Sequence, residues 1–217
     1  MSDIDVPQPV FDPEEFDQWA ADYDEEIARA EGFPFEGYHA LMDEIIRLAE
    51  VQPGMRLLDL GTGTGNLAIR FKELGCSVVG TDFSQEMLSI ARRKAPDIEF
   101  LNWDLREPWH KDLVGTFNRV VSAYVFHHFT LPRKAEIIAD IMHRMHPDGK
   151  ILIADISFVD RKHIDQARIR YKDGWDEEEY WIAEETLPVL RQYGWQVFYA
   201  QVTNLAGIYS ISCDNHV

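Results

Sequence analysis

The sequence has few cysteines, few positive charges and no long hydrophobic run. Only Cys76 and Cys213 occur among its 217 residues, which excludes a disulfide framework and favours a reducing compartment. No apolar stretch approaches the roughly 20 residues that span a bilayer, so we expect no membrane segment. Residues 1–15 lack the basic start and apolar core of a signal peptide. These absences predict a cytoplasmic protein.

Acidic residues outnumber lysine and arginine by 38 to 21, which gives a formal net charge of −17. Most of the imbalance lies in residues 1–50, whose only basic residues are Arg29 and Arg47. Nucleic acids and anionic membranes are bound mainly by clustered cations, so we expect neither as a partner. We interpret the acidic segment as a solvated surface, with attraction of cationic substrates as the less favoured alternative.

A hydrophobic content of 46% with 27% charged residues is typical of a globular chain. From about residue 55, short apolar runs alternate with helical patterns, which predicts an α/β fold with a mostly parallel sheet. The predicted strands are 56–60, 77–82, 98–101, 119–124, 150–155, 195–202 and 205–213. The last two are too close for a parallel crossover and must pair as an antiparallel hairpin. The predicted helices are 13–30, 38–50, 66–74, 85–94, 133–145 and 160–193, and residues 147–149 are predicted to form a turn.

This pattern predicts a single domain over residues 1–217. Its parts are an N-terminal helical cap at 1–50, a ligand-binding core at 51–156, a helical insert at 157–193 and the hairpin at 194–217. We expect a monomer or a homodimer.

The segment from Gly61 to Gly65 ends the first predicted strand and opens a helix with glycine at alternate positions. Such glycines permit positive φ and let a ligand approach the backbone. In an open α/β sheet this turn places a ligand beyond the carboxyl ends of the strands. The dinucleotide fingerprint would need glycine at Asn66, and the phosphate loop would need a following Gly-Lys-Ser/Thr. The spacing therefore disfavours a nicotinamide-dependent oxidoreductase.

Carboxylates lie at the ends of three successive predicted strands. Asp59, two residues before the first glycine, suits a cationic ligand group. Asp82 ends the second strand, where a carboxylate can accept hydrogen bonds from ribose hydroxyls. Asp104 follows the third strand and can accept from an exocyclic amine. Together with the glycines they predict a site for a positively charged nucleoside, a description that S-adenosylmethionine fits.

Over residues 38–156 the sequence resembles the class I S-adenosylmethionine-dependent methyltransferases. LLDLGTGTGNLA resembles the first motif of that family, VVGTDFSQEMLSIARRKAP the second, NWDL the third, and NRVVSAYVFHHF the fourth strand with its loop. The upstream WAADYDEE and the C-terminal part resemble the YrrT-type bacterial methyltransferases. The resemblance implies a Rossmann-like, doubly wound sheet of seven strands and an enzyme that moves a methyl group to a small-molecule acceptor by in-line displacement. S-Adenosylhomocysteine would be the other product.

The resemblance also implies roles for single residues. Gly61, Gly63 and Gly65 would approach the methionine part of the cofactor, with Asp59 orienting its amino group and Thr62 in the same turn. Asp82 would hold the ribose, Phe83 and Met87 would enclose the adenine, and Asp104 and Leu105 would contact the adenine edge. Ala123 and Tyr124 would lie beside the methionine, and Tyr23 would close over the cofactor. The alternatives are that Asp82 caps a turn, that Phe83 and Met87 are core, and that Tyr23 packs its helix.

His127 and His128, in the loop after the fourth strand, are the candidate general bases, with Tyr23 as a further catalytic candidate. A base is needed only if the acceptor must lose a proton. The alternative is that both histidines are structural. His143 and His146 have helical spacing but no third ligand nearby in sequence, so we expect surface histidines and no metal.

The acceptor pocket is predicted to involve the N-terminal helices, the loop at 124–131, Asp155 and the segment 160–193. For that segment we favour an amphipathic helix with packed aromatics and solvated acids over a lid that binds a cationic acceptor. The alternative function is a non-catalytic S-adenosylmethionine-binding protein, a sensor or degenerate enzyme, which would lack an open acceptor pocket.

Overall fold

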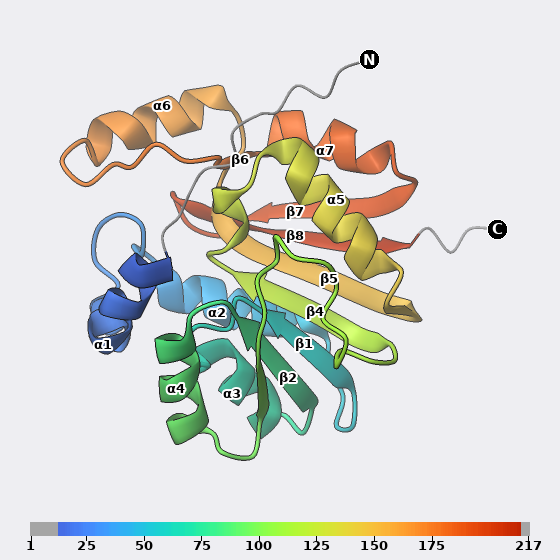
Figure 1. Cartoon of the computed structure of the whole chain (residues 1–217). Coiled ribbons are helices and arrows are strands. Elements are labelled where there is room, and N and C mark those ends of the chain that lie inside the picture. Colours follow the sequence, from blue (N-terminus) through green and yellow to red (C-terminus); the bar gives the residue numbers. More distant parts are fainter. Residues whose placement is uncertain (1–12, 214–217) are drawn as a thin grey trace.

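The computed structural model describes residues 13–213 and shows one twisted sheet with helices on both faces (Figure 1). The strands are β1 (Arg56–Leu60), β2 (Ser77–Asp82), β3 (Glu99–Asn102), β4 (Phe117–Ala123), β5 (Met145–Phe158), β6 (Trp181–Ile182), β7 (Trp195–Gln201) and β8 (Ala206–Cys213). The α-helices are α1 (Pro13–Arg29), α2 (Tyr38–Ala49), α3 (Asn66–Glu73), α4 (Gln85–Lys94), α5 (Leu131–Met142), α6 (Arg161–Arg170) and α7 (Ala183–Arg191).

The strand order is β3-β2-β1-β4-β5-β8-β7, and the short β6 pairs with β5 outside this path. β1 to β5 are mutually parallel, whereas β8 runs antiparallel to both β5 and β7. The predicted parallel sheet with a C-terminal antiparallel hairpin is therefore confirmed. β1 is buried on both faces, with Leu57, Leu58 and Leu60 all fully buried, as a strand covered by helices on both sides must be.

The chain runs from β1 outward to β3 and then returns to β4 on the other side of β1. This reversal opens a crevice at the carboxyl ends of β1 and β4, the usual ligand position in such sheets. In Figure 1, α1, the loop after it and the segment after α6 all lie on this side of the sheet. The topology thus brings parts from both ends of the chain to the same edge.

Local signals in the sequence explain α4. The Ser84 side chain accepts a hydrogen bond from the Met87 amide at 3.1 Å, so it caps the helix as predicted. Glu86 lies in the first turn, and the basic residues 92–94 fill the last turn, which matches the helix dipole at both ends. Leu88 and Ala91 pack into the core. The start of this helix fixes the Asp82–Phe83 corner beside the crevice.

Two predictions about local structure were wrong. Residues 171–182 are not helical; four consecutive acids at 176–179 repel one another, and the segment ends in the short strand β6. Residues 147–149 lie inside β5, where the pairing with β4 shifts register between Met145 and Lys150, so the Pro-Asp-Gly sequence forms a bulge rather than a turn between elements. His143 and His146 are exposed as expected, but His146 lies in β5 and does not share a helical face with His143.

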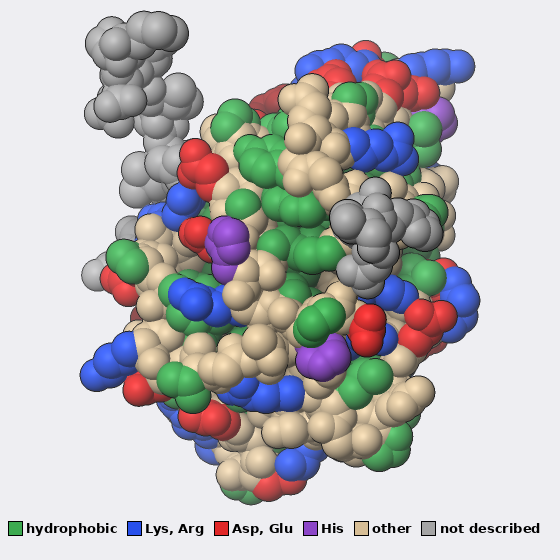
Figure 2. Space-filling model, turned by 90° about the vertical axis from the view of Figure 1, so that its right-hand side faces the viewer, with side chains coloured by type: hydrophobic (Ala, Val, Ile, Leu, Met, Phe, Trp, Pro, Cys, Tyr) green, Lys and Arg blue, Asp and Glu red, His purple; other side chains and the backbone are tan. Residues whose placement is uncertain are grey.

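Among residues 13–213, no helix is long and apolar enough to cross a membrane. Figure 2 shows one face of the molecule, with a band of hydrophobic side chains bordered by charged residues of both signs. On this face lysine and arginine are scattered among acidic residues, whereas phosphate backbones are bound by clustered cations.

Candidate active site

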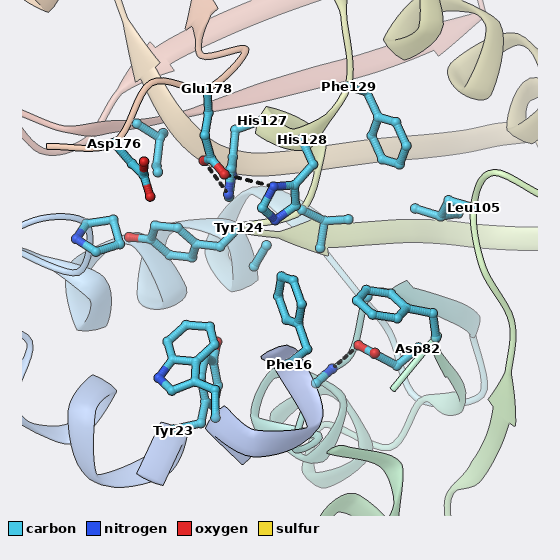
Figure 3. A pocket seen from close by; sticks show the side chains of 18 of the residues that line it. Phe16, Tyr23, Asp82, Leu105, Tyr124, His127, His128, Phe129, Asp176 and Glu178 are labelled. Carbon is cyan, nitrogen blue, oxygen red and sulfur yellow. Dashed lines mark hydrogen bonds and ion pairs between the residues drawn. The ribbon is translucent and has the colours of Figure 1, made fainter. Parts of the chain in front are cut away.

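A cavity of about 930 Å³ lies at the carboxyl ends of the parallel strands. It is lined by α1, by the loops after β1, β2, β3 and β4, and by the segment after α6. Figure 3 shows that Asp82 faces it from one side and the group of His127, His128 and Glu178 from the other, with Phe16 and Tyr23 of α1 beneath. Its volume is large enough for a nucleoside cofactor together with a small second molecule.

Asp82 is fixed by backbone hydrogen bonds. The Gly63 amide donates to its Oδ2 at 2.8 Å, and the Ser84 amide donates to its Oδ1 at 2.9 Å. Burial raises the pKa of Asp82 to about 6, although these amides oppose the shift. The carboxylate therefore links the glycine turn to the start of α4 and lines the cavity between them.

Asp59 and Thr62 lie behind the glycine turn, at a small separate pocket that Tyr23 and Tyr124 also line. The Thr62 hydroxyl donates to Asp59 Oδ2 at 2.7 Å. Burial raises the pKa of Asp59 to about 7, and the neighbouring Asp82 adds to the increase. Such a buried acid is stabilised in its charged form when a cation binds nearby.

The three glycines have different surroundings. A Cβ at Gly61 would lie 2.3 Å from Val125 Cγ2, and one at Gly65 would lie 3.2 Å from Ala91 Cβ. The absence of a side chain at these two glycines therefore allows Val125 and Ala91 to pack against the backbone. A Cβ at Gly63 would have no neighbour nearer than Tyr23 Cε1 at 3.9 Å, and Gly63 lines the cavity. Gly63 therefore keeps the backbone accessible to a ligand, whereas Gly65 is a packing residue that does not line the cavity.

Gly61→Ala should destabilise the fold more than Gly32→Ala, by about 1–3 kcal/mol. Both glycines have positive φ, +65° and +72°, so both variants carry the backbone strain of that region, but Gly32 has open space around it. The added methyl group at Gly61 must displace the branched Val125 side chain. Urea unfolding of the two variants measures the difference, and equal losses would show that Val125 relaxes freely.

The residues expected at the adenine also line the cavity. Met87 is 3% exposed, and the Phe83 ring meets Phe16 of α1 edge-on at 5.1 Å between centroids. Asp104 is already engaged, because Arg106 donates to both of its oxygens at 2.6–3.0 Å. A ligand that binds Asp104 would therefore share its carboxylate with Arg106, unlike a ligand at Asp59 or Asp82.

Helix α1 covers the cavity and is anchored by its own acids. Ser84 donates to Asp17 at 2.5 Å, and Thr64 and Lys94 contact Asp24 at 2.6 Å and 2.9 Å. These contacts correct the interpretation of the acidic segment as a purely solvated surface. They place Tyr23, on the inner face of α1, against the glycine turn.

At the end of β4, Ala123 and Tyr124 line both pockets. Tyr124 has φ of 56°, a conformation that a residue with a side chain rarely adopts. Its ring stacks on Tyr38 at 5.8 Å, and burial raises its pKa well above the usual range. Its hydroxyl is buried with no hydrogen-bond partner among the described residues. Strain of this kind concentrates at ligand sites.

His127 is held by Asp155 at the end of β5. Its Nδ1 lies 2.6 Å from Asp155 Oδ1, and its backbone amide donates to Oδ2 at 2.8 Å. Trp181 donates to the same carboxylate at 2.9 Å. Burial lowers the pKa of His127, but Asp155 and Glu178 outweigh this and raise it above the ordinary value. The contact with Asp155 fixes a proton on Nδ1 and leaves Nε2 directed to the cavity side.

Glu178 completes this group from the segment after α6. Its carboxylate lies 3.3 Å from His127 Nε2 and 3.0 Å from His128 Nδ1. Burial raises the pKa of Glu178, but His128 and His127 outweigh this and hold it below its usual value. One atom from each of these three side chains lies within 4.8 Å of the other two. Among the described residues, they form the group that could hold a metal ion.

The sequence did not reveal two residues of this site, Phe16 and Trp19, which line the cavity from α1 without a local spacing signal. The acids of the insert were expected to be solvated, which is wrong for Glu178, because it contacts the histidines across about 50 residues of chain. The aromatic residues of the insert are packed as predicted: Trp181 is 1% exposed and stacks on Tyr209.

Comparison with known proteins gives consistent matches. A family model described as a methyltransferase domain matches residues 57–149. An uncharacterized methyltransferase of Geobacillus kaustophilus is 32% identical over 206 residues, which cover 86% of this chain and 89% of the relative. The uncharacterized methyltransferase YrrT of Halobacillus halophilus is 28% identical over 203 residues, covering 88% and 92%.

Solved structures share the fold at low sequence identity. The complex of DhpI with SAM and HEP has a TM-score of 0.71 at 19% identity and covers 91% of this chain and 94% of that one. The magnesium protoporphyrin IX methyltransferase of Synechocystis PCC 6803 with bound SAM has a TM-score of 0.67 at 16% identity, covering 94% and 99%.

Proposed function

The chain belongs to the S-adenosylmethionine-dependent methyltransferases, and from that premise we propose that it methylates a small-molecule acceptor by in-line displacement. The observation that carries this proposal is the single cavity that joins the glycine turn and Asp82 at one end to His127 and Glu178 at the other. Space for an acceptor beside His127 and Glu178 supports a catalytic enzyme and not a protein that only binds the cofactor.

The residues present fit S-adenosylmethionine, which supplies a methyl group activated on a positively charged sulfur. Gly63 offers a backbone without a Cβ at the cavity wall, and Asp82 offers a carboxylate already oriented by two amides. Phe83 and Met87 supply apolar surfaces for adenine beside it. Asp59 lies behind the turn, where its charge favours the cationic methionine end. Alignment of the donor and acceptor supplies most of the rate gain.

His127 is suited to accept a proton from the acceptor. The carboxylate of Asp155 holds the ring in one tautomer, which leaves Nε2 as the accepting atom. His128, whose pKa is lowered by burial and by His127, lies beside it and contacts Glu178. We assign His127 as the base, His128 as its neighbour that positions Glu178, and Tyr23 to closing the cavity rather than to proton transfer.

We further propose that the enzyme acts in the cytoplasm as a monomer or homodimer. The two cysteines support a reducing compartment, because Cys76 is buried and Cys213 exposed and both are unpaired. The size of the cavity supports a small acceptor, since the cofactor itself fills a large part of it.

A labelling experiment tests the acceptor class. The protein is incubated with methyl-labelled S-adenosylmethionine and a bacterial extract that has been divided by size. We expect label in the fraction below about 1 kDa. Label confined to RNA, DNA or protein would contradict the small-molecule proposal while leaving the cofactor assignment intact.

The affinity for S-adenosylmethionine should fall about tenfold between about pH 7.5 and pH 5.5. The pKa values of Asp59 and Asp82 are raised to about 7 and about 6, so both carboxyls gain protons as the pH falls through this window. The protonated forms neither attract the cation nor accept ribose hydrogen bonds fully. Calorimetry at the two pH values measures the change, and Asp82→Asn should reduce it while leaving the part that comes from Asp59. Equal affinity at both would show that neither carboxylate responds to the ligand.

A further inference from the structure

Acidic residues outnumber cations in the wall of the acceptor half of the cavity. Among the residues that line the cavity there is no lysine or arginine, whereas four consecutive acids, residues 176–179, contribute to its wall. The nearest buried cation, Lys134, donates to the backbone carbonyl of Glu179 and lies over the Trp181 ring, outside the cavity lining. The charge of this half therefore favours a positively charged ligand and opposes an anionic one.

Of these acids, Asp176 is available to a ligand, and Glu178 would share its carboxylate between a ligand and the histidines. Glu177 pairs with Arg168 at 3.0 Å, which offsets its charge. The carboxylate of Asp176 forms no hydrogen bond or ion pair with any residue of the described chain, and Glu178 contacts only the imidazoles of His127 and His128. Figure 3 shows the Asp176 and Glu178 carboxylates on the same side of the pocket as the histidines.

An unsatisfied hydroxyl provides a second, independent indication of a polar ligand. Tyr124 Oη is buried and has no partner among residues 13–213, and its side chain runs toward the Asp176 side of the pocket in Figure 3. Leaving such a group unpaired costs free energy, which a ligand N–H can recover by donating to the oxygen. Three aromatic residues, whose faces attract cations, also line the cavity: Trp19, Phe33 and Phe35.

We propose that the acceptor is an amine, bound as its ammonium form by Glu178 and Asp176 and methylated on nitrogen. This inference rests on the proposed function and adds the substrate class. Carboxylates, an unpaired hydroxyl oxygen and aromatic faces are all groups that interact favourably with an N–H cation. The same acidic residues would repel a carboxylate or phosphate acceptor.

The reaction balances with the residues present. The ammonium gives one proton to His127 Nε2, while the proton on Nδ1 stays on the bond to Asp155. The freed nitrogen lone pair forms the N–C bond to the methyl carbon as the S–C bond breaks, and the electron pair of that bond stays on sulfur. The positive charge passes from sulfur to nitrogen, the product leaves as a methylammonium ion, and the proton on His127 passes to water.

A metal ion at His127, His128 and Glu178 is the competing explanation of the acidic wall. Glu178 is already paired with His128 Nδ1 at 3.0 Å, and its contact with His127 Nε2 at 3.3 Å becomes a hydrogen bond when that nitrogen takes a proton. A metal bound there also gives no role to Asp176 or to the Tyr124 hydroxyl. The amine accounts for all of these groups.

The test divides the small-molecule extract by charge on ion-exchange resins at about pH 7. Each pool is incubated with labelled S-adenosylmethionine in the presence of EDTA, and cofactor binding is verified separately by calorimetry. We expect label in the cationic pool, on nitrogen by mass spectrometry. Label in the anionic or neutral pool, no label in any pool, or activity that requires added Zn²⁺ or Mn²⁺ overturns the amine assignment. Failure to bind S-adenosylmethionine would instead overturn the proposed function.

Charge-neutral variants locate the ammonium site. Glu178→Gln should lower kcat/KM for the cationic pool about 10- to 100-fold, and Asp176→Asn, at an exposed carboxylate, about fivefold and mainly through KM, with the Kd for S-adenosylmethionine unchanged in both. Asp173→Asn is the matched control, because Asp173 is an exposed acid of the same segment that does not line the cavity. It should stay within about twofold of the parent. Equal effects of all three would show that the charge acts at long range and that no ammonium site exists.

Discussion

His127→Asn is expected to lower turnover about 10²- to 10⁴-fold while S-adenosylmethionine binds as tightly as before. The asparagine amide nitrogen can take the place of Nδ1 and keep the hydrogen bond to Asp155, so the loop stays in place. What the variant loses is Nε2, the atom that we assign as proton acceptor. Single-turnover rates with whichever small-molecule pool accepts label measure the chemical step, and calorimetry measures cofactor affinity.

The pH profile separates this role from a structural one. The His127 base must be neutral to act. Its pKa is raised above the ordinary histidine value, because Asp155 and Glu178 outweigh burial and the opposing charge of Lys134. The ring of His128 lies beside it. Turnover should therefore rise with pH through this raised pKa, and the rising limb should vanish in His127→Asn. His143→Asn, at an exposed position, is the control and should match the parent. Equal turnover in His127→Asn would make the residue structural.

Asp82→Ala is expected to weaken S-adenosylmethionine binding by about 1–3 kcal/mol, which is roughly 5- to 150-fold in Kd. The variant removes the charged acceptor at the position of the ribose. It also leaves the amides of Gly63 and Ser84, which donate to Asp82 at 2.8 Å and 2.9 Å, without their partner. The glycine turn therefore loses both a ligand contact and a support.

Asp104→Ala is the matched comparison. Asp104 also lines the cavity, but its carboxylate is engaged by Arg106, so its removal should cost less affinity than the removal of Asp82. Calorimetric Kd values of the two variants test this order. A larger loss for Asp104 would move the main polar anchor from the ribose to the adenine edge.

Much of the fold followed from the sequence because local chemistry encodes it. The glycine turn, the cap at Ser84 and the alternation of apolar runs with helical patterns are all short-range signals, and strands β1 and β2 were predicted to the residue. The short link between β7 and β8 was enough to require an antiparallel hairpin. The failures, residues 147–149 and 171–182, lie where pairing and packing with distant segments override local composition.

The acceptor side of the site was harder to predict for the same reason. His127 and His128 carry a local signal, being adjacent polar residues after an apolar strand, but their environment is set by Asp155 and Glu178 from two later segments. Likewise, α1 is held over the cavity by Asp17 and Asp24, whose partners lie at least 40 residues away. Such contacts depend on the strand order, which the sequence pattern alone does not specify.

The most direct test of this account is titration calorimetry of the protein with S-adenosylmethionine and S-adenosylhomocysteine, beside Asp82→Ala. We expect both ligands to bind the parent protein with micromolar affinity at a single site, and the variant to bind them about 5- to 150-fold more weakly. Absence of binding by both ligands to the folded parent protein would contradict the assignment of the glycine turn, Asp59 and Asp82 to this cofactor.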